Sequence, residues 1–217
     1  MNEKTTRDGE TAKTVAAQLR AEIVTGELAP GILLRQEDLA QRFNTSRMPI
    51  RDCLKILERE GLVVLPMNRS AQVAPLDPES FQEINEMRAV AEPLALKLAI
   101  PELTNRQIEI AEAFQDEAER ADVNQFSKLN KSFHIALLTP CNRPRLLNHI
   151  ATLNDLSERY FQAAAIELNY TDRSNQEHRE LLAASRKRDV EMASQILESH
   201  ISNASKQMLE TLSARQT

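Results

Sequence analysis

Glycine is scarce in this chain of 217 residues, and its four glycines all lie within the first 61 residues. Together with the lack of β-type alternation after that point, this scarcity favours an all-α second half. Cysteine is scarce too. Cys53 and Cys141 lie in unrelated regions, so the sequence predicts no disulfide framework and a reducing compartment. An apolar run long enough to span a membrane and a signal peptide are both missing, so we expect a cytoplasmic protein with no membrane partner.

Positive charge is in short supply over the whole chain but not over its first third. The net charge is −5 and the isoelectric point is about 5.5, which argues against non-specific binding of polyanions by the whole molecule. Residues 13–75 nevertheless contain nine Lys and Arg against seven Asp and Glu, whereas residues 76–217 contain 16 against 22. This distribution leaves room for a small basic face on one domain.

Residues 45–62 carry two regular patterns on one helix. Ser46 is a natural N-cap, and Pro49 falls in the first turn, where a missing N–H costs little. Apolar side chains line one face, at Ile50, Cys53, Leu54 and Leu57. Basic side chains recur every fourth residue on a different face, at Arg47, Arg51, Lys55 and Arg59. Such a helix fits the recognition element of a DNA-binding domain, although the pattern alone is equally typical of an ordinary amphipathic surface helix.

Further segments favour the DNA-binding interpretation. Helical patterns at 15–25 and 36–43 precede the basic helix. Short β-type runs at 62–65 and 71–74 follow it. A tight turn at 44–45 joins the second helix to the basic helix, as in a helix-turn-helix unit. The β-type runs predict a hairpin whose tip, with Asn68 and Arg69, is placed to contact DNA backbone or minor groove. The order predicts a winged helix-turn-helix domain over residues 11–75.

This part of the chain resembles the amino-terminal domain of the GntR family of bacterial transcription regulators. The resemblance rests on ELAPG, on the LA of the short helix, on the SRxPxR block that begins at Ser46 and on EGL. The DNA-contacting residues that it implies are Arg35, Gln36, Ser46, Arg47, Met48, Arg51, Asn68 and Arg69. Of these, residues 46–48 would approach base edges, and the others would hold phosphate, groove or backbone. The chain departs from the family pattern at Ser70, where Gly is usual, and at Met48, where Thr is common.

Beyond the winged domain the chain has the pattern of successive helices. We expect a mobile tail over residues 1–10 and a linker over residues 76–80, which two prolines stiffen. Residues 81–217 would form an all-α effector-binding and dimerisation domain, so the fold is mainly α with a six-helix bundle. The expected helices are 79–99, 104–120, 123–138, 143–168, 174–187 and 190–212. Pro93 would kink or split the first helix, and the SNQE box at 174–177 would cap the fifth.

Three of the four histidines can be brought together by helix geometry. Asn130 and His134 are four residues apart and share a helix face. His178 and His200 lie eleven residues on either side of Asp189, which would cap the last helix. At a rise of about 1.5 Å per residue, both rings lie roughly 16 Å from this turn, at the same height across an antiparallel pair. Three imidazoles and an amide oxygen predict a site for Zn²⁺, Ni²⁺ or a similar divalent ion, unless each histidine is only a hydrogen-bonded core or surface residue.

A second resemblance covers these helices. FSKLNKSFHIALL, NQEHRELLAA and LESHISNA are similar to the ligand-binding FCD domain of the FadR subfamily, and the compact length is similar to its VanR-like branch. The metal ligands that it implies are Asn130, His134, His178 and His200. Asn130 replaces the usual Asp, so the site would bind its ion less tightly, or bind a different ion, or use an anionic effector to complete the coordination shell.

His149 has no counterpart in this ligand pattern. The same resemblance also indicates how an effector would bind. It implies that Arg88 reaches into the cavity and clamps a carboxylate with its guanidinium, so the effector would be a small organic acid. The alternative is that Arg88 only forms a surface ion pair with Glu92, four residues away.

The sequence therefore predicts a cytoplasmic, homodimeric, metabolite-responsive transcription regulator that is not an enzyme. Each winged domain would contact one half-site of a roughly palindromic operator, and the helical domain would bind the effector and alter the spacing of the two DNA-binding domains. Repression relieved by ligand is the commoner mode in the family. Two alternatives stay open. One is a metal-dependent hydrolase fused to a DNA-binding domain, for which Glu177 is poorly placed and H-E-x-x-H is missing, and the other is a regulator whose metal site has decayed.

Overall fold

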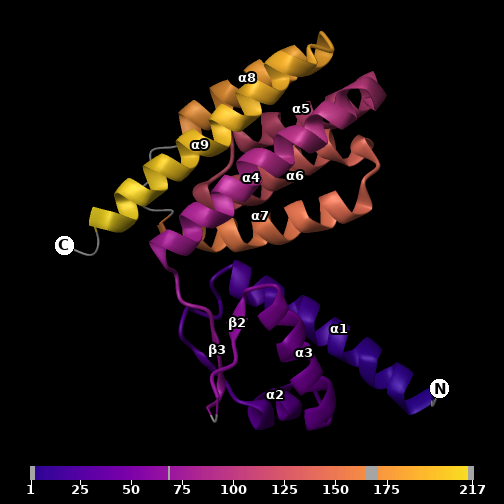
Figure 1. The fold of residues 1–217 in the computed structure, drawn as a ribbon, viewed down its shortest axis with the longest axis vertical. Helices are drawn as coiled ribbons and strands as arrows, with labels where there is room; N and C mark the ends of the chain where they lie inside the picture. Colours follow the sequence, from indigo (N-terminus) through magenta and orange to yellow (C-terminus); the bar gives the residue numbers. More distant parts are fainter. Residues whose placement is uncertain (1–2, 68, 165–170, 215–217) are drawn as a thin grey trace. The chain divides into compact units, whose positions relative to one another are not determined.

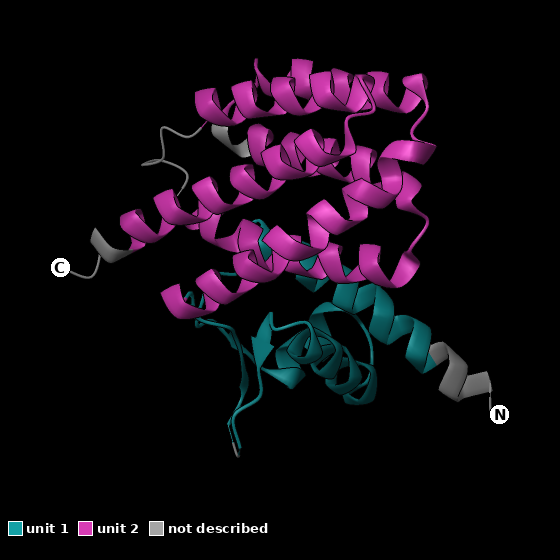
Figure 2. Ribbon diagram, turned by 45° about the horizontal axis from the view of Figure 1, so that its top comes forward, with its two compact units in different colours: residues 1–76 teal, residues 77–217 magenta. Residues whose placement is uncertain are grey.

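The chain divides into two compact units, residues 1–76 and residues 77–217 (Figure 2). The computed structural model describes residues 3–67, 69–164 and 171–214 (Figure 1). Asn68, one of the expected DNA contacts, lies outside the described residues.

Unit 1 contains three helices and three short strands in its described part. Their order is α1 Glu3–Val24, β1 Leu33–Leu34, α2 Gln36–Arg42, α3 Arg47–Arg59, β2 Val63–Val64 and β3 Ala71–Val73. The strands form one antiparallel sheet in the order β1-β3-β2, with Leu33 opposite Gln72 and Val63 opposite Val73. The pair α2–α3 followed by the β2–β3 hairpin confirms the predicted winged helix-turn-helix fold (Figure 1).

Helices α1 and α3 form the core of unit 1 because each has one apolar face. Five side chains from the two helices are at most 2% exposed: Leu19, Ile23, Ile50, Leu54 and Leu57. Burying each of them stabilises the fold by about 1.5–3 kcal/mol relative to exposure. The turn between α2 and α3 depends on Asn44, whose φ of 47° lies in the left-handed region that asparagine tolerates better than most residues. This turn leaves the basic face of α3 exposed to solvent.

Two expectations for unit 1 need correction, and one strand was missed. Residues 3–10, expected to be a tail, are helical and belong to α1; helix growth is cooperative, so a formed helix extends into a polar segment that lacks a strong breaker. Strand β1 was not predicted, because its two residues are too few to show alternation. Ser46 occupies the N-cap position of α3, but among the described residues its side chain makes no capping hydrogen bond.

Cys53 is fully buried in α3, and burial raises the pKa of its thiol to about 12. At pH 8 only about one thiol in 10,000 would then be ionised, and the thiolate is the reactive form. We expect Cys53 in a Cys141→Ala variant to resist alkylation by iodoacetamide until unit 1 unfolds. The measurement is labelling followed by mass spectrometry across a urea series. Labelling in the native protein as fast as in the unfolded chain would contradict the packing role that the sequence predicts.

Unit 2 consists of helices and short connections in its described part, with no strand there. Its elements are α4 Pro78–Ala99, the 3₁₀ turn Ile100–Glu102, α5 Asn105–Ala118, α6 Val123–Leu138, the 3₁₀ turn Thr139–Cys141, α7 Pro144–Ala164, α8 Thr171–Arg186 and α9 Val190–Ala214. Helix α4 packs against both α7 and α9 (Figure 1). These α-helices confirm the predicted all-α bundle, with a continuous core that includes Leu96, Phe133, Leu181 and Leu197.

The helix ends in unit 2 match the sequence patterns in part. Asp189 caps α9 as expected, because its Oδ1 accepts a hydrogen bond of 3.1 Å from the backbone N–H of Met192. The expected box at 174–177 is wrong: α8 begins at Thr171, so Ser174 is a fully buried residue inside the helix. The linker is shorter than expected, since Asp77 caps α4 and Pro78 occupies its first turn. Pro93 lies inside α4 without splitting it.

Candidate metal centre and nucleic-acid interface

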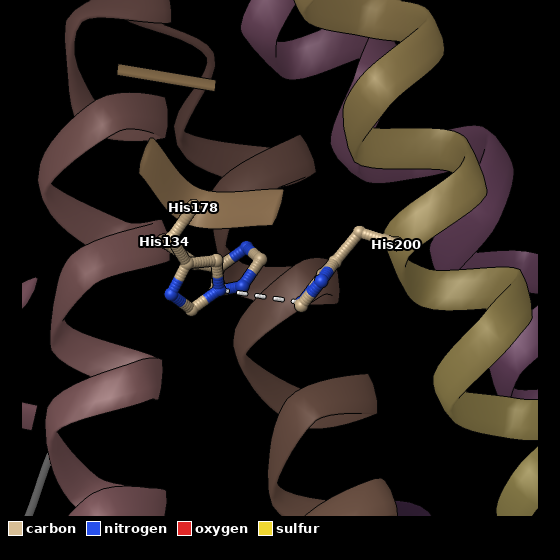
Figure 3. Close-up of side chains that lie close together, drawn as sticks. All are labelled: His134, His178 and His200. Atoms are coloured by element: carbon tan, nitrogen blue, oxygen red, sulfur yellow. Dashed lines mark hydrogen bonds between the residues drawn. The ribbon is translucent and has the colours of Figure 1, made fainter. Parts of the chain in front are cut away.

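Three histidines from three helices meet inside unit 2. His134 comes from α6, His178 from α8 and His200 from α9, and their side chains point toward one another (Figure 3). All three are buried, with 2%, 0% and 4% of their surface exposed. Each offers one ring nitrogen, and the three nitrogens lie within 4.8 Å of one another. The structure thus brings together the three histidines that the sequence pattern selected, whereas His149 is exposed on α7.

The spacing of these nitrogens suits a divalent ion. Two nitrogens bound at about 2.05 Å to a tetrahedral ion lie about 3.3 Å apart. The Nε2 atoms of His178 and His200 are 3.4 Å apart, which matches this separation. This pair of nitrogens therefore has the spacing found at a Zn²⁺ or Ni²⁺ site.

Polar atoms without partners point to the same conclusion. Both ring nitrogens of His134 and Oδ1 of Asn130 are buried and find no hydrogen-bond partner among the described residues. A buried polar atom left unbonded costs about 1–3 kcal/mol, so such atoms are uncommon in folded proteins. An ion at the cluster would contact a His134 nitrogen, and the Asn130 amide oxygen is of a type that binds divalent ions. The donors present at this place therefore fit a metal ion.

The protonation state of the cluster also suits metal binding. Burial lowers the pKa of His178 well below its ordinary value, and the neighbouring His200 and His134 lower it further. Burial likewise lowers the pKa of His200, and the hydrogen bond with Glu177 opposes this shift only in part. Neutral imidazole is the form that binds metals, so the site keeps these two rings ready at neutral pH.

A cavity of about 80 Å³ adjoins the cluster. Its lining includes Arg88, Asn130, His134, Asn154 and His200. The volume exceeds the roughly 15 Å³ that one water needs, so it can hold a small organic molecule in contact with the histidines. Most of the exposed lining surface is apolar, with several polar groups among it, as in typical small-molecule sites.

Arg88 lines this cavity, but most of its guanidinium is already bound within the protein. Its Nε donates to Oε1 of Glu92 at 2.9 Å, and its Nη1 donates to Oδ1 of Asn85 at 2.9 Å and to Oγ of Ser157 at 3.0 Å. Among these described contacts Nη2 takes part in none. The clamp expected from the sequence stays a prediction, and contact through two nitrogens would require one of these bonds to be exchanged.

The pair formed by Arg88 and Glu92 is buried, which differs from the surface ion pair considered as the alternative. Their side chains are 9% and 0% exposed. Burial by itself raises the pKa of Glu92, but the charge of Arg88 and the contact with His134 outweigh it and hold the pKa at about 2. Glu92 is therefore a carboxylate inside the bundle, and its Oε2 lies 3.3 Å from Nδ1 of His134. The sequence pattern did not indicate this contact.

The predicted DNA-contacting residues that the structure describes lie on the surface of unit 1. A surface groove is lined by Leu34, Arg35, Gln36, Glu37, Arg47, Arg69, Ser70 and Ala71. Ser46, Met48 and Arg51 are exposed at the start of α3. Arg47 forms an ion pair of 2.9 Å with Glu37 of α2, a neighbour that the sequence did not indicate. The groove therefore combines three arginines from different segments on one face.

Two protein-family profiles match the chain. The profile described as bacterial regulatory proteins, gntR family, matches residues 11–73, and the FCD domain profile matches residues 83–203. The chain belongs to the GntR family of bacterial transcription regulators. As a GntR regulator it carries a DNA-binding domain and an effector domain of the FCD type, and it is not an enzyme. The hydrolase alternative is therefore excluded. Glu177, the carboxylate considered for that alternative, contacts Nδ1 of His200 through its Oε2.

Individual relatives of this GntR regulator agree with the family. It is 29% identical over 196 residues to the HTH-type transcriptional regulator YdhC of Bacillus subtilis, covering 86% of this chain and 85% of the relative. It is 30% identical to a gluconate operon transcriptional repressor of Bacillus licheniformis, over 63% of this chain and 58% of the relative. The E. coli McbR/YncC structure has a TM-score of 0.79 at 22% identity, covers 93% of this chain and 98% of its own, and so shows the same fold.

The GntR regulator shows no membrane-spanning segment in the part of the chain that the structure describes, since none of those helices is both long and apolar enough.

Proposed function

We propose that this protein is a cytoplasmic, homodimeric repressor that releases a palindromic operator when a small carboxylate binds in unit 2 beside a Zn²⁺ or Ni²⁺ ion. The observation that carries the proposal is the convergence of His134, His178 and His200 beside a cavity, with Oδ1 of Asn130 left unbonded. A centre with three nitrogen ligands and an open position is typical of sites that bind an exogenous ligand. The gluconate operon repressor among the relatives supports a repressor role.

The effector is proposed to be a small organic acid because of the donors around the cavity. Nη2 of Arg88 and the buried, unbonded Nδ2 of Asn154 are available to an acceptor. When bound, the ion supplies positive charge at its open position, where a carboxylate is favoured. Asn130 is neutral, so the effector's charge would take the place of the acidic ligand that related sites use.

The dimer is proposed to form through an exposed apolar stripe on α4. The stripe comprises Met87, Val90, Leu94 and Leu98, which are 37%, 72%, 49% and 36% exposed. Spacings of three, four and four residues place these side chains on one face of the helix. A contiguous exposed apolar face marks an interaction surface, and a two-fold axis would pair the stripe with its own copy. A second copy of the chain is therefore the occupant that we propose.

The DNA contacts are proposed to be the eight residues that the family resemblance implies, and Arg47 is chosen for the test because its side chain is 68% exposed. We expect Arg47→Ala to weaken operator binding by about 1–3 kcal/mol and to relax discrimination at one base-pair position. The measurement is fluorescence anisotropy on the selected operator and on each single-base variant of it. Lys55→Ala, on the basic face but farther along α3, is the control. Equal losses for Arg47→Ala on operator and random DNA would show a phosphate contact instead of a base contact.

The proposed function is tested by operator selection combined with metal analysis. The protein is purified in chelator, then loaded with Zn²⁺ or Ni²⁺, and each form is used to select binding sites from random duplex DNA. We expect one palindromic motif, about one metal ion per chain in the loaded form, and release of the operator by small carboxylic acids. Without an enriched motif the regulator proposal fails. A motif without metal retention would instead support the regulator with a decayed metal site.

A further inference from the structure

The Nδ1 atom of each clustered histidine lies close to a side-chain oxygen from a different helix. Nδ1 of His200 lies 2.8 Å from Oε2 of Glu177 on α8. Nδ1 of His178 lies 2.6 Å from Oε1 of Gln115 on α5. Nδ1 of His134 lies 3.3 Å from Oε2 of Glu92 on α4, a distance that allows charge attraction although the two atoms form no hydrogen bond in this structure. In all three histidines Nδ1 is thus the ring atom that approaches a polar side chain outside the cluster.

For His134 and His200 this neighbour is a carboxylate, which when ionised can only accept. Charged neighbours hold both carboxylates in this form: Arg88 donates to Glu92, and Arg173 donates to Glu177. Asn203 also donates to Glu177, at 3.1 Å. The proton of His134 and that of His200 is therefore favoured on Nδ1, because a lone pair there would face the lone pairs of a carboxylate.

For His178 a chain of hydrogen bonds leads to the same result. Gln115 Nε2 lies 3.1 Å from Oε1 of Glu119, and Glu119 accepts from Nε of Arg179 at 2.7 Å. An ionised Glu119 can only accept, so the amide NH₂ of Gln115 must face it, with a further bond of 2.8 Å to Oδ1 of Asn175. The amide oxygen of Gln115 is then left facing His178, whose Nδ1 must carry the proton.

We propose that Glu92, Gln115 and Glu177 are positioning residues of the metal centre, which keep the proton of all three imidazoles on Nδ1 and direct the three Nε2 lone pairs to one ion. The inference rests on the proposed metal site. A hydrogen bond at the second nitrogen orients a ligating histidine and raises its basicity. Because Asn130 brings no charge, the affinity of this centre depends more on its imidazoles than in a site with an acidic ligand.

Glu177 is the best residue for a test because its side chain is 15% exposed and its other partners lie near the surface. We expect Glu177→Ala to raise the Kd for Zn²⁺ by about 10- to 100-fold, measured by competition with a chromogenic chelator. The visible spectrum of the Co²⁺-loaded protein should change as well, because His200 loses its orientation. Glu177→Gln should recover part of the affinity, since its amide oxygen can still accept from Nδ1. Glu180→Ala removes an exposed glutamate on the same helix, which accepts a hydrogen bond from Gln176, and this variant should match the wild type.

Gln115→Leu gives an independent test of the positioning role from α5. It replaces the first test if Glu177→Ala loses helical content. It should also raise the Kd by about 10- to 100-fold, because His178 would lose its acceptor. A folded Glu177→Ala or Gln115→Leu protein with the wild-type Kd and Co²⁺ spectrum would overturn the positioning role. If His200→Ala too keeps the wild-type Kd, the proposed metal site itself is wrong, and the two failures are thereby distinguished.

Discussion

His200→Ala is expected to abolish the thermal stabilisation that Zn²⁺ or Ni²⁺ gives the protein. An ion that binds only the folded state, at about 1,000 times its Kd, stabilises that state by about 4 kcal/mol. For a domain of this size the melting temperature of unit 2 would rise on the order of 10 °C. Loss of His200 leaves two imidazoles, which lie on different helices and hold an ion far less tightly. The measurement is differential scanning calorimetry with metal and with chelator.

The matched control is His149→Ala, which removes the one histidine outside the cluster. His149 is exposed on α7, so this variant should keep the full metal response. Unit 1 has its own core, so operator-independent DNA binding should survive in both variants. A metal-induced shift of equal size in wild type and His200→Ala would place the ion elsewhere.

The second large effect is expected from Leu94→Asp, which puts a charge in the middle of the apolar stripe on α4. Leu94 is 49% exposed, so the chain should fold, whereas burying an unpaired carboxylate in a dimer interface is costly. We expect a monomer by sedimentation equilibrium. Operator affinity should fall by about 100-fold or more, because the second half-site is no longer bound by a tethered second domain.

Ile110→Asp is the control for this prediction. Ile110 is an equally exposed apolar residue, at 44%, but it lies on α5 and outside the stripe. It should leave both the oligomeric state and the operator affinity unchanged. A Leu94→Asp protein that stays dimeric would locate the interface on another face, and a monomeric wild type with full operator affinity would remove the need for a dimer.

The parts of the fold that sequence predicted best are those whose signals are local. The spacing of Ile50, Leu54 and Leu57 predicts α3, and the structure buries these side chains. The equal distances of His178 and His200 from Asp189 predict their approach, because an antiparallel helix pair converts sequence distance into height. Both inferences depend only on helix periodicity and one turn.

What sequence did not predict depends on tertiary contacts. The role of Glu92 arises because α4 brings it to His134, and nothing in its own helix pattern distinguishes it from the exposed Glu86. Gln115 likewise acquires its role through Glu119 and the distant Arg179. Strand β1 exists only because β3 pairs with it. Each of these features depends on contact with a segment distant in the sequence, and hydrophobic periodicity does not predict such contacts.

The three clustered histidines differ in how far along the chain they must come together. His178 and His200 approach through contacts within one helical hairpin, whereas His134 precedes them with all of α7 in between. Two ligands can therefore assemble early from local structure, but the third requires the topology of the bundle to be complete. Retention of a tightly bound ion would then report that unit 2 has folded completely, since only the complete bundle would hold all three ligands.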